Sequence, residues 1–201
     1  PQAGRFRGFQ QADVDIIGRG LDVTADAECL MAIGHALSAL KVGSFVLHIN
    51  HIAIAKTLLQ KCGIPSQHEA AALRVIDKLA KIGEEKVKQE MVSKGINQEG
   101  IDKLQPLFEL KGSFDVQMDN LKKILTTSSE GLEGIKELSF INSVINTIGL
   151  KSISMKLNLT LARGLNYYTG AIFEVSPPSK VSIGSIGGGG RYDDLTGIFG
   201  L

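Results

Sequence analysis

The spacing of hydrophobic and polar positions changes twice along the chain. Near the start, in RFRGFQQADVDII, polar and apolar residues nearly alternate, which predicts a strand over residues 5–17. Residues 25–42 carry an apolar stripe at helical spacing, with Thr24 as the expected cap and Gly43 as the expected end. The stripe consists of Leu30, Ile33, Leu37 and Leu40. The run SFVLHIN then predicts a short buried strand.

From His51 to about Gly149 strand signals largely vanish and helical segments take over. CGIPS, SKGINQEG and LKGS punctuate these segments, and TTSSEG near Thr126 is the most linker-like stretch. An apolar stripe then predicts a further helix that Gly149 terminates. The stripe consists of Leu138, Ile141, Val144, Ile145 and Ile148. The pattern predicts an all-helical insertion.

The insertion is locally basic. Its lysines are Lys78, Lys81, Lys86, Lys88 and Lys94. Acidic residues interleave with them, so a solvated helical face is the favoured explanation, and a nucleic-acid patch is the alternative.

Strand signals return after the helical part. Apolar and polar residues alternate in SISMKLNLTL, and further strands are expected at GAIFEV and around residues 182–186. These runs predict an antiparallel sheet in the last part of the chain. The helix-rich region would then interrupt a single α+β domain.

Composition narrows the class of protein. The chain has 201 residues, 43% hydrophobic and 21% charged, with a formal net charge of +1. That charge argues against general electrostatic binding of nucleic acid. No apolar run approaches the roughly 20 residues of a membrane span, and the N-terminus lacks a secretory signal, so a cytoplasmic location is expected. Cys29 and Cys62 are expected to be free thiols, and the four histidines are scattered, so we expect no protein-held metal or organic cofactor.

The glycine run in SIGGGGRYDDL indicates a strand that approaches another group closely. It has neither the Gly-Lys-Ser/Thr of a P-loop nor the following helix of a dinucleotide fingerprint. Close packing between strands is the alternative explanation for these glycines.

Four blocks occur together in the order and spacing of one family: GRFRGFQQADVDIIG, DAE, LARGLNYYTGAIFEV and GGGGRYDDLTGIFG. The chain resembles the histidyl-tRNA synthetases over nearly its whole length. RGLNYYTG and GGRYD look like the two histidine-specific signatures, and GRFRGFQQADVD looks like the end of class II motif 2. The resemblance implies a class II synthetase-like antiparallel β-sheet with flanking helices, interrupted by a helical insertion. Residues 1–50 and 132–201 would form part of the catalytic core, and residues 51–131 the insertion.

The resemblance also implies an activity. Histidine's carboxylate would attack the α-phosphate of ATP, supplied with Mg²⁺, and the histidyl group would then pass from histidyl-adenylate to tRNA(His). Arg163 matches the arginine beside the carboxylate and the α-phosphate, where it would stabilise the transition state. A sheet-edge ion pair is the alternative role for Arg163. The family implies a homodimer whose insertion approaches the tRNA acceptor arm.

The resemblance assigns a histidine pocket. A neutral imidazole has one donor and one acceptor nitrogen, and Asp15 and Tyr168 would read that ring. Gln11 would help to hold the α-ammonium group. The other implied histidine-binding residues are Arg163, Tyr167, Gly188, Gly189, Gly190 and Tyr192. The ATP phosphates would be bound by Arg5, with Arg7 as a weaker candidate.

The chain departs from the family pattern in ways that bear on activity. By the resemblance, Gly8 and Asn166 replace commoner family residues, and we expect the chain to lack motif 1, the start of motif 2 and motif 3. We therefore expect this fragment to be inactive alone. The alternative function is a catalytically silent regulatory or uncharged-tRNA-sensing module, but Arg163, Tyr168 and the GGRYD block favour the enzyme.

Overall fold

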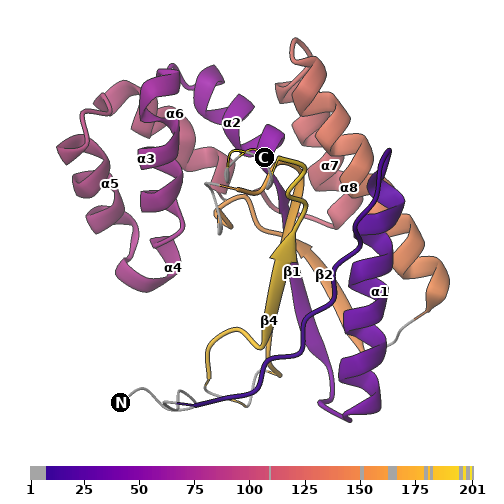
Figure 1. The fold of residues 1–201 in the computed structure, drawn as a ribbon. Helices are drawn as coiled ribbons and strands as arrows, with labels where there is room; N and C mark the ends of the chain where they lie inside the picture. The colour runs from indigo at the N-terminus through magenta and orange to yellow at the C-terminus, as the bar shows by residue number, and fades with distance from the viewer. Residues whose placement is uncertain are drawn as a thin grey trace.

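The computed structural model describes residues 8–108, 110–149, 152–162, 167–178, 181, 183–194, 197 and 200. One long helix and a strand precede a series of helices, and three strands follow them (Figure 1). In chain order the elements are α1 (Val23–Ala39), β1 (Phe45–His51), α2 (Ile52–Lys61), α3 (Ser66–Ile76), α4 (Leu79–Ile82), α5 (Glu84–Ser93), α6 (Gln98–Phe108), α7 (Phe114–Ile124), α8 (Ser129–Ile148), β2 (Ile153–Leu157), β3 (Ala171–Ser176) and β4 (Gly187–Gly190).

The strands form a four-stranded sheet in the order β2-β1-β3-β4. The α+β class is confirmed, but the expectation of a wholly antiparallel sheet needs correction because β1 and β2 are parallel. The other two pairings are antiparallel. Parallel neighbours need a long crossover connection. The helices from α2 to α8 provide it, and they bring the chain back to the end of the sheet where β1 began.

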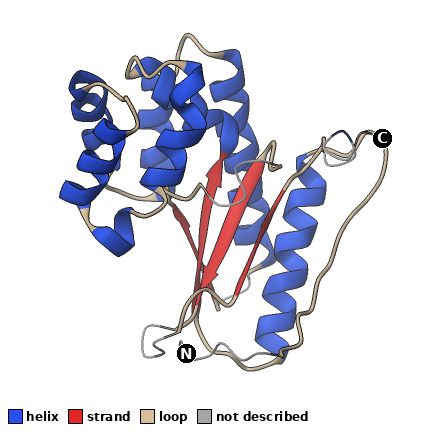
Figure 2. Ribbon diagram, turned by 60° about the vertical axis from the view of Figure 1, so that its left-hand side comes forward, coloured by secondary structure: helices blue, strands red, loops and turns tan. Residues whose placement is uncertain are grey.

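A first hydrophobic cluster lies between one face of the sheet and α1, α7 and α8. Phe45, Leu47 and Ile49 alternate along β1 and are all buried in this cluster, as the period of a strand requires. The stripe of α8 packs against the same face, with Leu138 and Ile141 fully buried. Figure 2 shows the red strands between the long helix on the right and the helical group at the upper left.

A second hydrophobic cluster is built almost entirely from α2 to α6. Helix α2 belongs to both clusters. Its Ile54 and Leu58 face the sheet, whereas Ala55 and Leu59 face α3 and the helices that follow.

Part of the predicted insertion also packs on the sheet. Helix α7 places Met118 and Leu121 in the first cluster, together with Leu125 just after it. The domain boundaries at 50/51 and 131/132 stay a prediction.

The strand expected over residues 5–17 is wrong for the described part of that range. Residues 8–17 are in neither a helix nor a strand, and the side chains of Phe9 and Ile17 are 75% and 88% exposed. This segment therefore does not join the sheet that contains β2. An alternating sequence forms a strand only where a neighbouring strand pairs with its backbone. Along the chain, β1 is the first strand of the described sheet.

Helix α1 begins earlier and ends earlier than its pattern predicts. The capping side chain is Asp22 rather than Thr24, and its carboxylate accepts from the Thr24 backbone N–H at 2.8 Å. Lys41 adopts a left-handed φ of 54°, which ends the helix before Gly43. Leu40, the last member of the predicted stripe, is consequently 74% exposed.

The glycine run itself is the last strand. The strand expected around residues 182–186 is placed later, at Gly187–Gly190, where it pairs with β3. Ser182 lies outside the described residues.

Candidate functional site

The end of β4 brings Gly190 against Tyr168. A Cβ built on Gly190 would lie 2.7 Å from the Ala171 carbonyl oxygen and 3.0 Å from Tyr168 Cδ1. Tyr168 also packs in a small cluster with Ile52, Leu161 and Ile172. Only a residue without a side chain fits here, so the glycine signature allows one backbone to approach another together with an aromatic ring.

Asp15 is held by the residue that follows this strand end. The Tyr192 hydroxyl donates to Asp15 Oδ1 at 2.5 Å. This hydrogen bond raises the pKa of Tyr192 to about 12, and burial and the charge of Asp15 add to the shift. Asp15 is thus linked through Tyr192 and Arg191 to Gly190, which lies against Tyr168, the other residue implied to read the imidazole.

The remaining predicted site residues are only partly described. The side-chain amide of Gln11 donates a hydrogen bond to Asp13 Oδ1 at 2.8 Å. Tyr167 stacks at a tilt against Tyr168, with ring centroids 4.3 Å apart, and is 41% exposed. Gly188 lies opposite Glu174 in the ladder, and Gly189 lies opposite Phe173. Arg5, Arg7 and Arg163 lie outside the described residues.

The segment leading to residue 163 is anchored from two sides. The buried Asn50 donates its amide to the carbonyl oxygens of Leu159 and Leu161, at 3.3 and 2.9 Å. Asp77, the C-cap of α3, accepts from the backbone N–H of Ala162 at 3.3 Å. The helical part of the chain therefore contributes directly to the position of this segment.

Sequence reasoning missed Arg191, which forms a partly buried ion-pair cluster with Asp26 of α1 and Glu137 of α8. Its guanidinium donates through Nε and Nη2 to Asp26, and through Nη1 to Glu137 Oε1 at 3.1 Å. Nη2 also lies 3.0 Å from Glu137 Oε2. The three side chains are only 19%, 12% and 18% exposed. A planar guanidinium is suited to holding two carboxylates in this way.

His51 completes the cluster from the end of β1. Its Nδ1 accepts from the Ala53 backbone N–H at 3.1 Å, where His51 caps α2. Nδ1 therefore carries no proton, and Nε2–H donates to Glu137 Oε2 at 3.0 Å. The cluster joins β1, α1, α8 and the end of β4 through four side chains. We call Asp26, His51, Glu137 and Arg191 the arginine cluster.

Burial and pairing act in opposite directions on the acids of the arginine cluster. Burial raises the pKa of Asp26, and hydrogen bonding and charge from Arg191 offset only part of that rise. Burial also opposes ionisation of Glu137, but His51 and Arg191 together hold its pKa below the ordinary value. Burial lowers the pKa of Arg191, but its hydrogen bonds to Asp26 and Glu137 raise it by more. Arg191 therefore stays positively charged.

The sheet face away from the first cluster carries a row of polar residues. Lys156, His48 and Glu174 lie opposite one another on β2, β1 and β3, and Gly188 of β4 lies opposite Glu174. Burial lowers the pKa of His48; the charge of Lys156 adds to this effect and that of Glu174 opposes it.

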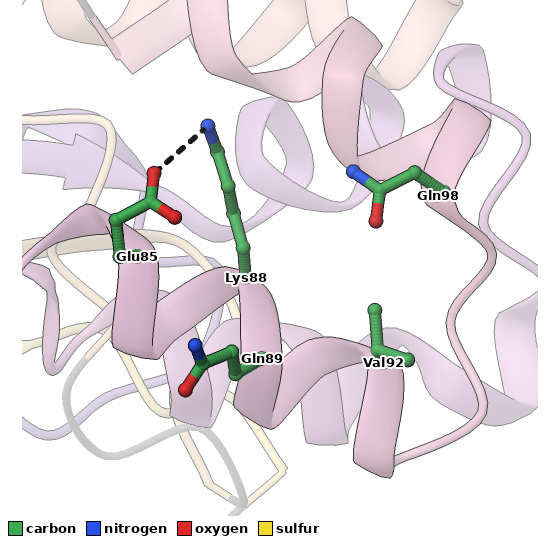
Figure 3. A pocket seen from close by; sticks show the side chains of 5 residues that line it. All are labelled: Glu85, Lys88, Gln89, Val92 and Gln98. Atoms are coloured by element: carbon green, nitrogen blue, oxygen red, sulfur yellow. Dashed lines mark ion pairs between the residues drawn. The ribbon is translucent and has the colours of Figure 1, made fainter.

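A shallow recess of about 470 Å³ lies elsewhere, on α5 and the start of α6 (Figure 3). Its lining residues are Glu85, Lys88, Gln89, Val92 and Gln98. Lys88 pairs across one turn of α5 with Glu84 at 2.6 Å and Glu85 at 3.7 Å. The recess contains none of the predicted site residues. We assign no chemistry to it, because its polar groups are already paired or exposed.

Two further features bear on other classes of function. Within the described residues, no group of three or more His, Cys, Asp or Glu side chains is arranged to hold a metal ion. None of the described helices is long and apolar enough to cross a membrane.

Solved structures place this architecture in a known class. The histidyl-tRNA synthetase of Nostoc sp. PCC 7120 superposes with a TM-score of 0.79 at 33% identity, over 89% of this chain and 42% of that one. A Bacillus halodurans structure titled as an ATP phosphoribosyltransferase regulatory subunit/histidyl-tRNA synthetase gives 0.74 at 22% identity, over 92% and 47%. The second likeness shows the fold alone. The chain has the class II synthetase-like α+β fold.

Sequence comparison gives the family. The family model for histidyl-tRNA synthetase matches residues 1–201. The chain is 46% identical to the histidine–tRNA ligase of Christiangramia forsetii and 43% identical to that of Flavobacterium johnsoniae. These alignments cover 100% of this chain, but 44% and 42% of the two relatives. The chain belongs to the histidyl-tRNA synthetase family and spans less than half the length of these relatives.

Proposed function

We propose that the chain is part of the catalytic domain of a histidine–tRNA ligase. The whole protein would activate histidine with ATP and Mg²⁺ to give histidyl-adenylate and pyrophosphate, and would then transfer the histidyl group to tRNA(His). The observation that carries this proposal is the meeting of both signature blocks at the end of β4. Tyr168 packs beside Gly190 there, and Tyr192 donates to Asp15.

This arrangement suits recognition of an imidazole. A carboxylate offers about four lone-pair sites, so Asp15 can accept from Tyr192 and also from a substrate N–H. The Tyr168 ring and the Gly188–Gly190 backbone would bound the ligand, with Tyr167 and Tyr192 as further walls and Gln11 at the α-ammonium group. A site that satisfies both ring nitrogens rejects side chains that lack them, because its own polar groups would be left unpaired.

Arg163 would act on the reacting groups. The attack brings a carboxylate and a phosphate together, and a guanidinium between two anions relieves their repulsion as charge develops. Arg5 and Arg7 would bind the ATP phosphates.

The partners follow from the same proposal. The helices within residues 51–131 would approach the acceptor arm of tRNA(His), and the whole protein would act as a cytoplasmic homodimer. This fragment alone would be inactive.

The test is histidine-dependent exchange of pyrophosphate into ATP by the full-length protein that contains this chain. Asp15→Asn should raise the KM for histidine by about 10-fold or more, because it removes one charged hydrogen-bond acceptor. Asp115→Asn is the matched control, since Asp115 is an exposed aspartate on α7.

Absence of exchange with histidine would contradict the proposed activity. If the unaltered protein then bound histidine or uncharged tRNA without exchange, the catalytically silent module would be the better description. An unchanged KM in Asp15→Asn would exclude Asp15 from the histidine pocket.

A further inference from the structure

We propose that Arg191 is a positioning residue for the histidine pocket, and that the arginine cluster fixes the strand end that carries the pocket wall. This inference rests on the proposed function, because it assigns Arg191 a role at that site. Arg191 lies between Gly190, which contacts Tyr168, and Tyr192, which donates to Asp15.

The backbone of Arg191 continues the ladder beyond β4. Its N–H donates to the Ala171 carbonyl oxygen at 2.9 Å, and its carbonyl oxygen accepts from the Thr169 N–H at 2.8 Å. Thr169 and Asp193 add a second link, because the Thr169 hydroxyl donates to Asp193 Oδ2 at 2.7 Å. The strand end is thus fixed along its edge by β3 and the residues before it.

The side chain of Arg191 fixes the same strand end from one face. A Cβ on Gly189 would meet Phe173 of the first cluster, whereas one on Gly190 would meet Ile172 and Tyr168 on the opposite face. Arg191 returns to the face of Gly189, where α1 and α8 present Asp26 and Glu137. Strand alternation therefore directs the anchor into the helix-covered face and the predicted pocket wall to the other.

The cluster has little freedom to rearrange. Asp26 and Glu137 both accept from the same guanidinium, and Glu137 also accepts from Nε2–H of His51. His51 carries its proton on Nε2 because Nδ1 caps α2. Two glycines leave room for these groups. A Cβ on Gly134 would lie 2.8 Å from His51 Nδ1, and one on Gly170 would lie 2.9 Å from Arg191 Cδ.

A cluster with a purely structural role would support the fold without setting the geometry of the pocket. Arg191→Lys separates the two roles, because lysine keeps the charge but cannot reproduce the planar fork. Positioning predicts that the KM for histidine in pyrophosphate exchange rises by about 10-fold or more while kcat changes much less, as expected when a binding wall shifts. Lys103→Met, which breaks an exposed ion pair on α6, is the control and should leave both constants unchanged.

A second readout does not depend on activity. Tyr192 has a pKa of about 12 because of its bond to Asp15, and the nearby Cys29 thiolate acts in the same direction. Arg191→Lys should lower that pKa toward the ordinary value of about 10, because the bond to Asp15 loosens. The pKa is measured by NMR in ¹³C-tyrosine-labelled full-length protein, with the Tyr192 signal assigned from its absence in Tyr192→Phe.

The outcomes separate the two proposals. A folded Arg191→Lys protein with unchanged KM and unchanged Tyr192 pKa would overturn the positioning role. The same holds if a smaller fraction of the Arg191→Lys protein is active but that fraction keeps both values. If the unaltered protein shows no exchange, the proposed function fails while the Tyr192 pKa still tests positioning. Should Arg191→Lys fail to fold, Asp26→Asn takes its place, because it keeps the shape of the acceptor and is judged by the same two readouts.

Discussion

Gly190 occupies a position with no room for a side chain. The nearest atom to a Cβ there is the Ala171 carbonyl oxygen, which is part of the sheet backbone and cannot move aside cheaply. We expect Gly190→Ala to lower the free energy of unfolding by about 1–3 kcal/mol, as overpacking does in other cores. Urea denaturation measures this loss.

Gly184→Ala is the matched control for that change. A Cβ on Gly184 would have nothing within 4 Å, so its effect should stay within about 0.5 kcal/mol. Equal losses in the two variants would show that close approach at Gly190 does not determine the cost, because Gly184 has no such contact.

His48 gives the sheet a pH dependence with a definite sign. Its pKa in the folded chain lies below the ordinary 6.5, chiefly because it is partly buried. As the pH falls through about 6.5, the unfolded chain binds a proton before the folded one, so the folded state loses stability. His48→Gln should therefore flatten the decline in unfolding free energy between about pH 7.5 and about pH 5.5, measured by urea denaturation.

His35→Gln, at an exposed position on α1, should leave the decline as it is in the unaltered protein. A decline that is the same in His48→Gln and the unaltered protein would show that His48 does not cause it.

Residues of the candidate site could be predicted only where the chain keeps them in recognisable blocks. Tyr168, Gly190 and Tyr192 belong to such blocks. Arg191 stands inside one too, but its partners Asp26 and Glu137 come from distant helices, and no spacing in the sequence joins them. The arginine cluster is a product of tertiary packing, so local patterns could not reveal it.

At the scale of elements, local sequence signals predicted the helices well, whereas the pairing of distant strands was not predicted correctly. Helix α8 follows its predicted stripe and ends at Gly149 with a left-handed φ of 69°, because both signals are local. Polar and apolar residues nearly alternate in residues 8–17, as they do in β2, yet only β2 has a neighbouring strand in the described sheet. Strand formation depends on a partner that a single segment does not specify.

The six lysines of residues 66–108 fall into two groups. Lys78, Lys88 and Lys103 are paired with acids at 2.6, 2.6 and 2.7 Å, whereas Lys81 and Lys86 are exposed. Lys94 is exposed as well. If the helices bind tRNA, the exposed group should carry most of the electrostatic attraction, because ion-paired lysines are already partly neutralised.

We therefore expect replacement of the three exposed lysines by glutamine to weaken tRNA binding in the full-length protein. The slope of log affinity against log salt should fall by about 0.7 to 0.9 for each phosphate that is no longer neutralised by a lysine. Replacement of the three paired lysines is the control and should do less, while histidine-dependent pyrophosphate exchange stays within a few-fold in both. Unchanged tRNA affinity and an unchanged salt slope in both triple variants would identify the lysines as a solvated face.

Across the whole molecule, α2 ties the two hydrophobic clusters together. Ile54 and Leu58 pack in the cluster against the sheet, and Ala55 and Leu59 pack in the cluster formed by the other helices. A deletion that removed all of residues 51–131 would therefore strip the sheet of packing from α2 and α7. A deletion intended to remove only a tRNA-binding surface has to spare both helices.

The parallel pairing of β1 and β2 sets an order for folding. β1 ends at His51 and its partner begins at Ile153, so on the ribosome β1 leaves the exit tunnel long before β2 exists. Helices α3 to α6 pack mainly through local contacts and can form in that interval, whereas the sheet awaits contacts between distant segments. We expect pulsed hydrogen exchange during refolding to protect α3 to α6 before β1. Until β2 and β3 arrive, both edges of β1 stay open to pairing with another chain, so nascent chains stalled between these strands should be the most prone to aggregation.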